Sequence, residues 1–187
     1  GLGDVYKRQT QQEASERANL ITVDTYDVHV DLTYASDTTF DSYPTVTTVK
    51  FAAQEGGSTF IDYIHHSVDS VKLNGRHLNV NDVVEGSRII LKNLAKENIL
   101  TIHGRSYFSH SGEGMHRFID PSDQRTYLYT QYEPADARRV FPNFEQPDLK
   151  AVFNFRITAP KNWVVSSNAE LERTVEDPSD SSITKRV

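Results

Sequence analysis

The stretch TQQEASERANLITVDTYDVHVDL, residues 10–32, changes its pattern halfway and predicts a helix followed by a strand. Thr10 and Glu13 form a capping-box pattern, in which each side chain accepts a hydrogen bond from the other residue's amide. We therefore expect a short helix that ends near Asn19. From Ile21 apolar and polar residues alternate, which is typical of a strand with one face in water. The residues expected on its buried face are Tyr26, Val28, Val30 and Leu32.

Further short runs of β-branched and aromatic residues predict more strands along the chain. The intervals between them are short and rich in Asp, Ser, Asn, Gly and Pro, which favours antiparallel connections over βαβ crossovers. Asn74-Gly75 is typical of a type I′ hairpin, and the stretch 176–182 predicts a polar turn between two strands. We predict a mainly β, mostly antiparallel fold. The other expected strands are 45–51, 59–64, 68–73, 88–91, 98–108, 126–131, 151–159 and 163–166.

Composition narrows the classes of function. The chain has 187 residues, enough for one domain, and its 37% hydrophobic and 25% charged residues are typical of a soluble globular protein. Its net charge is -6 and it has no basic run, which argues against a nucleic-acid partner. No apolar stretch reaches membrane-spanning length and no signal peptide is evident, so we expect no membrane partner. The absence of cysteine fits a reducing compartment, and we expect a cytoplasmic protein.

Both ends of the sequence bear on the domain boundaries. Residues 1–9, GLGDVYKRQ, resemble a translated adapter scar of the kind found at the ends of metagenomic reading frames. We expect them to be non-native and expect the domain to span residues 10–187. The last residues, 183–187, look like the start of a strand with no closing signal. We therefore expect the chain to be cut off within a longer protein.

The sequence offers no catalytic centre of its own. The seven histidines are scattered, and the adjacent His65 and His66 would point to opposite faces of a strand, which argues against a shared metal ion. We interpret them as surface residues. No His-Glu-x-x-His motif and no Gly-x-Ser-x-Gly elbow is present. Gly112-Glu113-Gly114 lacks the lysine of a phosphate-binding loop and is interpreted as a flexible loop. We expect neither catalytic residues nor metal ligands in this chain.

A more specific pattern occupies residues 127–151, YLYTQYEPADARRVFPNFEQPDLKA. It runs from an aromatic strand through a polar turn and one helical turn into a proline-punctuated loop. It resembles the signature of the N-terminal domain of zinc metallo-aminopeptidases of the aminopeptidase N family, the gluzincins related to membrane alanyl aminopeptidase. Residues 112–117 and 163–168 are similar to neighbouring landmarks of that family. Residues 23–28 and 60–62 most resemble its actinobacterial cytoplasmic branch.

The resemblance covers residues 10–187 and implies a saddle-like β-sheet or sandwich domain with a short N-terminal helix. It implies that a thermolysin-like catalytic domain of the same polypeptide follows and carries the zinc motif. Zinc would then be bound outside this chain, and the fragment alone would be inactive. The expected substrate is the N-terminus of a peptide, from which the enzyme removes amino acids.

The resemblance also assigns two substrate-binding residues. In the family, the glutamate of a Gln-x-Glu element binds the free α-amine of the substrate and the glutamine helps to shape the first side-chain pocket; these roles map onto Glu133 and Gln131. The chemistry is reasonable, because an α-ammonium with a pKa of about 8 is mostly charged at neutral pH and suits a fixed carboxylate. Residues two apart on one strand project from the same face, so both could line one cleft.

The remaining residues of the signature are interpreted as structural. Arg138 is expected to brace the Phe-Pro turn by pairing with Glu145 or Asp148, because guanidinium and carboxylate form bidentate pairs. Trp163 and the aromatic residues of the signature are expected to pack in the core or against another domain. These aromatic residues are Tyr127, Tyr129, Phe141, Phe144, Phe153 and Phe155.

Two other functions remain open. One is a free-standing β-sandwich module that binds peptides or glycans through exposed aromatic residues. The other is a relative of the leukotriene hydrolases, in which peptidase activity is lost or joined to epoxide hydrolysis, although Glu133 argues mildly against it. The gene beyond Val187 would discriminate, since a downstream His-Glu-x-x-His supports a peptidase and a stop codon supports a free-standing module.

Overall fold

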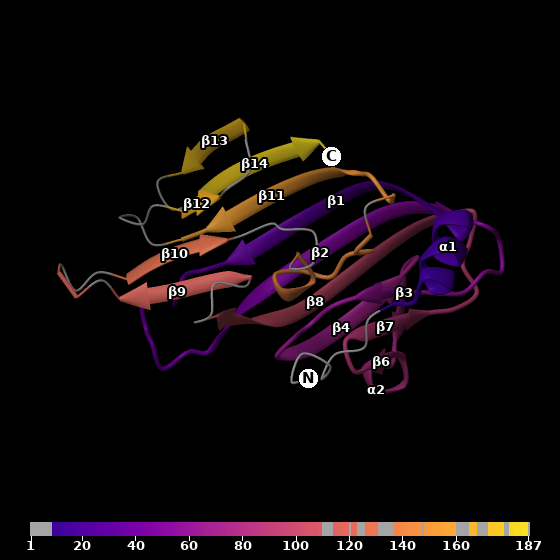
Figure 1. The fold of residues 1–187 in the computed structure, drawn as a ribbon, viewed down its shortest axis with the longest axis horizontal. Coiled ribbons are helices and arrows are strands. Elements are labelled where there is room, and N and C mark those ends of the chain that lie inside the picture. Colours follow the sequence, from indigo (N-terminus) through magenta and orange to yellow (C-terminus); the bar gives the residue numbers. More distant parts are fainter. Residues whose placement is uncertain are drawn as a thin grey trace.

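The computed structural model of the chain describes residues 9–109, 114–119, 121–122, 126–130, 137–146, 148–159, 165–167, 172–177 and 180–186. They form a long twisted sheet, a short second sheet and one N-terminal helix (Figure 1). The elements are α1 (Gln11–Leu20), β1 (Ile21–Asp31), β2 (Ser42–Ala53), β3 (Thr59–Asp62), β4 (Ser67–Leu73), β5 (Arg76–Leu78), α2 (Val80–Val83), β6 (Val84–Glu85), β7 (Arg88–Leu91), β8 (Glu97–Ser109), β9 (Met115–Ile119), β10 (Thr126–Thr130), η2 (Ala137–Arg139), β11 (Val152–Thr158), β12 (Val165–Ser167), β13 (Glu172–Asp177) and β14 (Asp180–Arg186). The prediction of a mainly β domain with a short N-terminal helix is confirmed.

The long sheet has the strand order β12-β10-β9-β8-β2-β1-β11-β14-β13, and β4 pairs with β8 off this path. Most neighbours are antiparallel, as predicted, and β2 with β8 forms the longest ladder. Three described pairs are parallel: β1 with β11, β8 with β9, and β10 with β12. The sequence could not reveal these, because side chains alternate between faces in the same way in both kinds of pairing.

The opening stretch folds as its pattern predicts. The Glu13 amide donates to Thr10 Oγ1 at 3.1 Å, and the Thr10 amide donates to Glu13 Oε1 at 3.0 Å, so the capping box is confirmed. Helix α1 continues through Leu20 and passes directly into β1. The residues predicted for the buried face of β1 are all buried. Helix α1 has few apolar residues and buries Arg17 instead.

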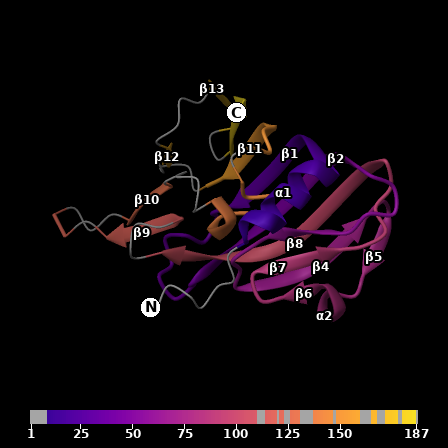
Figure 2. The ribbon, with the colours of Figure 1, turned by 45° about the vertical axis from the view of Figure 1, so that its right-hand side comes forward.

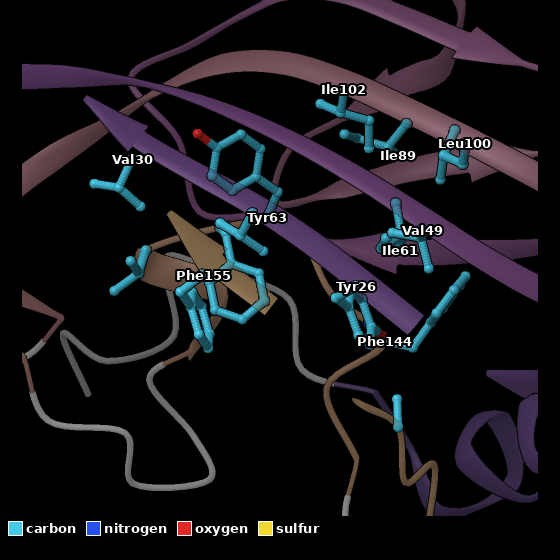
Figure 3. Close-up of a cluster of buried hydrophobic side chains, with 14 of the residues drawn as sticks. Tyr26, Val30, Val49, Ile61, Tyr63, Ile89, Leu100, Ile102, Phe144 and Phe155 are labelled. Atoms are coloured by element: carbon cyan, nitrogen blue, oxygen red, sulfur yellow. The ribbon is translucent and has the colours of Figure 1, made fainter. Parts of the chain in front are cut away.

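One part of the core lies between the long sheet and the short sheet β3-β7-β6 (Figure 3). Ile61 of β3 and Ile89 of β7 come from the short sheet, and Val49, Leu100 and Ile102 come from β2 and β8. All five side chains are buried completely. Burying a side chain of this size stabilises the fold by about 1.5–3 kcal/mol, so this layer accounts for the attachment of the short sheet.

Local turn chemistry agrees with the sequence in two places. Asn74 and Gly75 have φ values of 53° and 82°, as a type I′ turn requires, and they join β4 to β5. Strands β13 and β14 pair antiparallel on either side of the predicted polar turn, but they extend to Asp177 and from Asp180, so the connection is shorter than predicted.

His65 is half-buried and His66 is exposed, which confirms both as surface residues.

The elements that the sequence did not predict are short. They are α2, β6 and β9, of two to five residues each, too few to show a period. Strands β5 and β13 are implied by the predicted turns beside them, without predicted bounds. Strand β9 lies beside β10 at one end of the molecule, far from α1 (Figures 1 and 2). Trp163 lies outside the described residues.

Candidate functional site

The two residues predicted to bind substrate, Gln131 and Glu133, lie outside the described residues. The chain on both sides of them is described. Strand β10 ends at Thr130, and the 3-10 helix η2 begins at Ala137. The geometry of these two flanks therefore defines the frame for the predicted site.

The first flank is held by backbone pairing on both sides. Thr130 is paired with Met115 of β9 in the antiparallel direction and with Ser167 of β12 in the parallel direction. Strand β10 is thus an inner strand up to its last residue, and its position does not depend on a free edge.

The second flank, η2, packs against Gly114, the neighbour of the residue that pairs with Thr130. Gly114, which precedes β9, has a φ of 67°, and a Cβ there would lie 3.0 Å from Cβ of Arg139 in η2. Since Met115 pairs with Thr130, the chain before and the chain after residues 131–136 both meet the backbone at 114–115. The sequence pattern indicates only a flexible loop at Gly114, whereas the structure shows a positive φ and a close approach to Arg139, which together favour glycine there.

Residues 137–146, which we call the Phe-Pro loop, are fixed to the domain by main-chain hydrogen bonds. Asn143 forms a bridge with Asp62, with N–O distances of 2.9 and 3.0 Å. The Ile64 amide donates to the carbonyl oxygen of Arg138 at 2.8 Å. The buried hydroxyl of Ser106 donates to the carbonyl oxygen of Val140 at 2.7 Å. The loop is therefore attached to β8 and to the chain at the end of β3.

Aromatic packing holds the middle of the loop. The rings of Phe141 and Phe144 are buried, and Phe141 meets Phe155 edge-on with ring centroids 5.4 Å apart. The Tyr26 hydroxyl accepts a hydrogen bond from the Phe144 amide at 2.9 Å, and its ring stacks on Phe153 at 4.6 Å. Burial raises the pKa of Tyr26 well above its usual value, so this hydroxyl stays protonated. The packing role predicted for these phenylalanines is confirmed, while the side chains of Tyr127 and Tyr129 lie outside the description.

A buried ion pair joins helix α1 to the end of β3, and the loop is hydrogen-bonded to both of its members. Arg17 Nη1 lies 3.0 Å from Asp62 Oδ2, and both side chains are almost fully buried. Arg17 Nε donates to Gln146 Oε1 at 2.6 Å, and the Glu145 amide donates to Asp62 Oδ2 at 3.2 Å. Gln146 in turn donates from Nε2 to the carbonyl oxygen of Ala14 at 3.0 Å. Burial lowers the pKa of Arg17, and the carboxylate of Asp62 opposes that shift.

A second ion pair extends this network at the start of α1. Arg88 contacts the carboxylate of Glu13 at 2.7 and 3.2 Å. This hydrogen bond, together with that from the Thr10 amide, lowers the pKa of Glu13 to about 2. The guanidinium groups of Arg88 and Arg17 both lie near the ring of Phe60, 4.0 and 4.5 Å from its centroid. The helix is thus docked mainly by charge.

Arg138 lies beside Glu145, one of its two predicted partners, and contacts it through Nε and the backbone amide. Its Nε lies 3.0 Å from Glu145 Oε2, and its amide donates to Glu145 Oε1 at 2.9 Å. Both side chains are 11% exposed, so the pair is largely shielded from water. Asp148, the other predicted partner, accepts a hydrogen bond from Gln146 at 2.8 Å.

The described residues include no group of three or more His, Asp or Glu side chains that could hold a metal ion. Zinc therefore does not fit the side chains whose positions are described. No helix in the described part of the chain is long and apolar enough to cross a membrane.

Sequence reasoning missed the residues that attach the loop to the domain. Arg17 lies in a polar helix, and no pattern distinguishes it from exposed Glu16 beside it. Ser106 and Gly114 act through contacts with Val140 and Arg139, which are distant from them in sequence. Asp62 lies in the short motif 60–62 that resembles the family, and this resemblance is the sequence feature that could have identified it.

Comparison with known proteins agrees with this architecture. The family model described as "Peptidase M1 N-terminal domain" matches residues 7–185. The chain is 48% identical over 162 residues to "Aminopeptidase N" of Streptomyces lividans, covering 86% of this chain and 19% of that protein. It is 30% identical over 130 residues to "Probable M1 family aminopeptidase 1" of Encephalitozoon cuniculi (57% of this chain, 15% of that protein) and 32% identical over 76 residues to "Glutamyl aminopeptidase" of Rattus norvegicus (40% and 8%).

The chain thus spans less than a fifth of the length of each of these three relatives. The match to Streptomyces lividans is consistent with the resemblance to the actinobacterial branch. Because the family model covers nearly all of the chain, the chain belongs to the M1 peptidase family and is an N-terminal domain of that family's type.

Proposed function

We propose that this domain supplies substrate-amine recognition to a zinc-dependent aminopeptidase that removes N-terminal amino acids from peptides. The observation that carries the proposal is the 48% identity to an aminopeptidase N over 86% of the chain. In this proposal, Glu133 binds the α-ammonium of the substrate and Gln131 shapes the pocket for the first side chain. A carboxylate that binds the terminal amine selects which peptide bond meets the catalytic centre, which is what an exopeptidase requires.

The geometry of the flanks supports this role. Strand β10 is paired on both sides up to Thr130, and η2 is fixed by hydrogen bonds to both the amide and the carbonyl of Arg138. A carboxylate contributes most to orienting a ligand when its backbone is fixed in advance. The described residues on either side of positions 131–136 form such a fixed frame.

The proposal assigns the zinc and its chemistry to another domain. Zinc in an aminopeptidase activates water and polarises the scissile carbonyl. We propose that its ligands lie outside this chain, on the catalytic domain of the same polypeptide, which is the expected partner of this domain. We also propose a cytoplasmic location, which the absence of cysteine favours.

The test is Glu133→Gln in the full-length peptidase, which removes the charge and keeps the size of the side chain. We expect zinc content and melting temperature to be unchanged and kcat/KM for free-amine substrates to fall about ten- to a hundredfold, because a charge-assisted contact of about 1.5–3 kcal/mol is weakened. Substrates with an acetylated N-terminus serve as the control and should lose little more. Wild-type kcat/KM on free-amine substrates would show that Glu133 is a turn residue.

A second experiment uses the chain alone. Supplied with zinc, it should not hydrolyse aminoacyl-arylamide substrates, because the proposal places the metal ligands and the general base on another domain. Saturable, zinc-dependent turnover by the purified 187-residue chain would contradict that division of labour.

A further inference from the structure

The Asn74-Gly75 turn between β4 and β5 is exposed, yet the side-chain amide of Asn74 is held at both its nitrogen and its oxygen. Asn74 Nδ2 donates to Asn98 Oδ1 at 2.9 Å, and Asn74 Oδ1 accepts from the backbone amide of Ile99 at 2.8 Å. The backbone amide of Asn74 also donates to the carbonyl oxygen of Ile99 at 2.8 Å. Backbone and side chain of Asn74 thus both attach the turn to the start of β8.

The orientation of the Asn98 amide is fixed by the chain around it. This side chain is buried, and its Oδ1 also accepts from the Ala95 amide at 2.9 Å. Its Nδ2 donates to the carbonyl oxygens of Ala95 at 2.8 Å and Phe51 at 3.5 Å. Turning the amide over would place Nδ2 against a donor and Oδ1 against two carbonyl oxygens, so all three contacts would be lost. Asn98 therefore presents an acceptor to Asn74, and only a donor fits opposite it.

Asn74 is the only asparagine of the sequence that precedes a glycine. In such a pair the glycine nitrogen can attack Cγ of the asparagine, because glycine has no β-carbon to hinder the approach. A bond forms between Gly75 N and Asn74 Cγ, the bond from Cγ to Nδ2 breaks, and Nδ2 leaves as ammonia with the proton of the glycine amide. Water then opens the cyclic imide to an aspartate or to an isoaspartate, whose main chain runs through Cγ. Space is available at the turn, since a Cβ added at Gly75 would meet nothing within 4 Å.

The folded turn opposes both this reaction and its product. The attack makes Cγ tetrahedral and releases Nδ2, so it cannot proceed while both atoms of the Asn74 amide keep their hydrogen bonds. In the aspartate product, a carboxylate oxygen would face Asn98 Oδ1, and two acceptors repel each other. An isoaspartate would also lengthen the main chain within a two-residue hairpin turn, whose length sets the register of its strands.

From these contacts we propose that Asn74 is a site of spontaneous deamidation that Asn98 protects, and that its modification weakens the attachment of the β4–β5 turn to β8. In the folded chain the reaction proceeds through local opening of the turn, so its rate is proportional to the fraction of molecules in which the turn is open. The product adds a negative charge to a chain whose net charge is already -6, and it fits the site beside Asn98 less well than asparagine. The modification therefore accumulates as an irreversible loosening of this hairpin.

The first test follows deamidation of the purified chain by peptide mass spectrometry, in mildly alkaline buffer without urea and with urea above the unfolding transition. We expect Asn74 to be the fastest asparagine of the unfolded chain and to react about ten- to a hundredfold more slowly in the folded chain, because opening breaks two hydrogen bonds. The peptide 71–78 in both buffers corrects for the effect of urea itself. Equal rates at Asn74 in the folded and unfolded chain, or a faster reaction at another asparagine of the unfolded chain, would overturn the proposal.

Asn98→Ala tests the protecting residue. It removes the acceptor opposite Asn74 Nδ2, and we expect the rate at Asn74 in the folded chain to rise about tenfold. Asn143→Ala is the matched control, because Asn143 is also buried but donates to the carbonyl oxygen of Phe141 within the Phe-Pro loop. No acceleration by Asn98→Ala, or an equal acceleration by Asn143→Ala, would show that Asn98 does not protect the turn.

Asn74→Asp reproduces the aspartate product and keeps the proposal testable if Asn98→Ala does not fold. We expect it to lower the midpoint of urea denaturation, because a donor to Asn98 Oδ1 is replaced by an acceptor. Asn79→Asp is its control, since Asn79 caps α2 by accepting from the Asn81 amide at 3.1 Å, which a carboxylate does equally well. It should not lower the midpoint. An unchanged midpoint for Asn74→Asp would show that the product fits the turn, and the proposed loosening would be wrong.

Discussion

The hydroxyl of Tyr26 in β1 accepts a hydrogen bond from the backbone amide of Phe144, 118 residues further along the chain. The site is buried, so Tyr26→Phe leaves the Phe144 amide without its partner. We expect a loss of about 1–3 kcal/mol in the free energy of unfolding, measured by urea denaturation. Tyr34→Phe is the control, because Tyr34 is 64% exposed, and it should change stability by less than about 0.5 kcal/mol. Equal effects would show that the Tyr26 hydroxyl contributes nothing beyond its ring.

Gly114 combines a positive φ with a close neighbour, and Gly86 shares only the first property. Gly86 has a φ of 58°, and a Cβ added there would meet nothing within 4 Å, whereas a Cβ at Gly114 would lie 3.0 Å from Arg139 Cβ. Alanine at Gly86 should cost about 1–2 kcal/mol for its backbone conformation. Gly114→Ala should cost about 1 kcal/mol more, because η2 must also move. Matching denaturation midpoints for the two variants would argue against tight packing of η2 on β9.

The pKa of Glu13 is lowered from 4.5 to about 2 by its hydrogen bonds with Arg88 and Thr10. The unfolded chain therefore binds more protons than the folded chain between these values, so this stabilisation is complete above pH 4.5 and is lost as the pH falls towards 2. We expect Glu13→Gln to be less stable than wild type by about 1 kcal/mol at about pH 7, with a difference that shrinks below about pH 4. Urea denaturation at several pH values measures it. Glu16→Gln on the same helix is the control, and a pH-independent difference for Glu13→Gln would contradict the prediction.

Arg17→Met should destabilise the domain by about 3–5 kcal/mol, because it leaves the carboxylate of Asp62 buried without its counter-charge. The combined variant Arg17→Met with Asp62→Asn removes that charge and keeps an acceptor for the Glu145 amide. It should therefore be more stable than Arg17→Met alone, as urea denaturation can show. If the second substitution made the domain less stable still, the buried charge would not be the source of the loss.

A feature of the fold could be predicted from the sequence when it depends on residues that lie close together in the chain. The capping box, the alternation along β1 and the Asn74-Gly75 turn depend on residues close in sequence, and all three are predictable. The burial of Arg17 and the parallel pairing of β1 with β11 depend on partners far along the chain, and neither has a local pattern. At the candidate site, the opposite charges of Arg138 and Glu145 and their closeness in sequence predict their pairing. The contact of Arg139 with Gly114 could not be predicted, because glycine has no side chain whose chemistry would indicate a partner. The roles of Gln131 and Glu133 stay predictions.

The parallel pairing of β1 with β11 also has a consequence for how the chain folds. Asp27 is paired with Asn154, 127 residues later, while the other edge of β1 pairs with β2, the strand that follows it. During synthesis the ladder of β1, β2, β8 and β4 can form before β11 has been made, and until then β1 presents a row of unsatisfied amides and carbonyls. Such an edge is a template for pairing with other chains. We therefore expect the nascent domain to be most prone to aggregation in the interval between completion of β8 and arrival of β11.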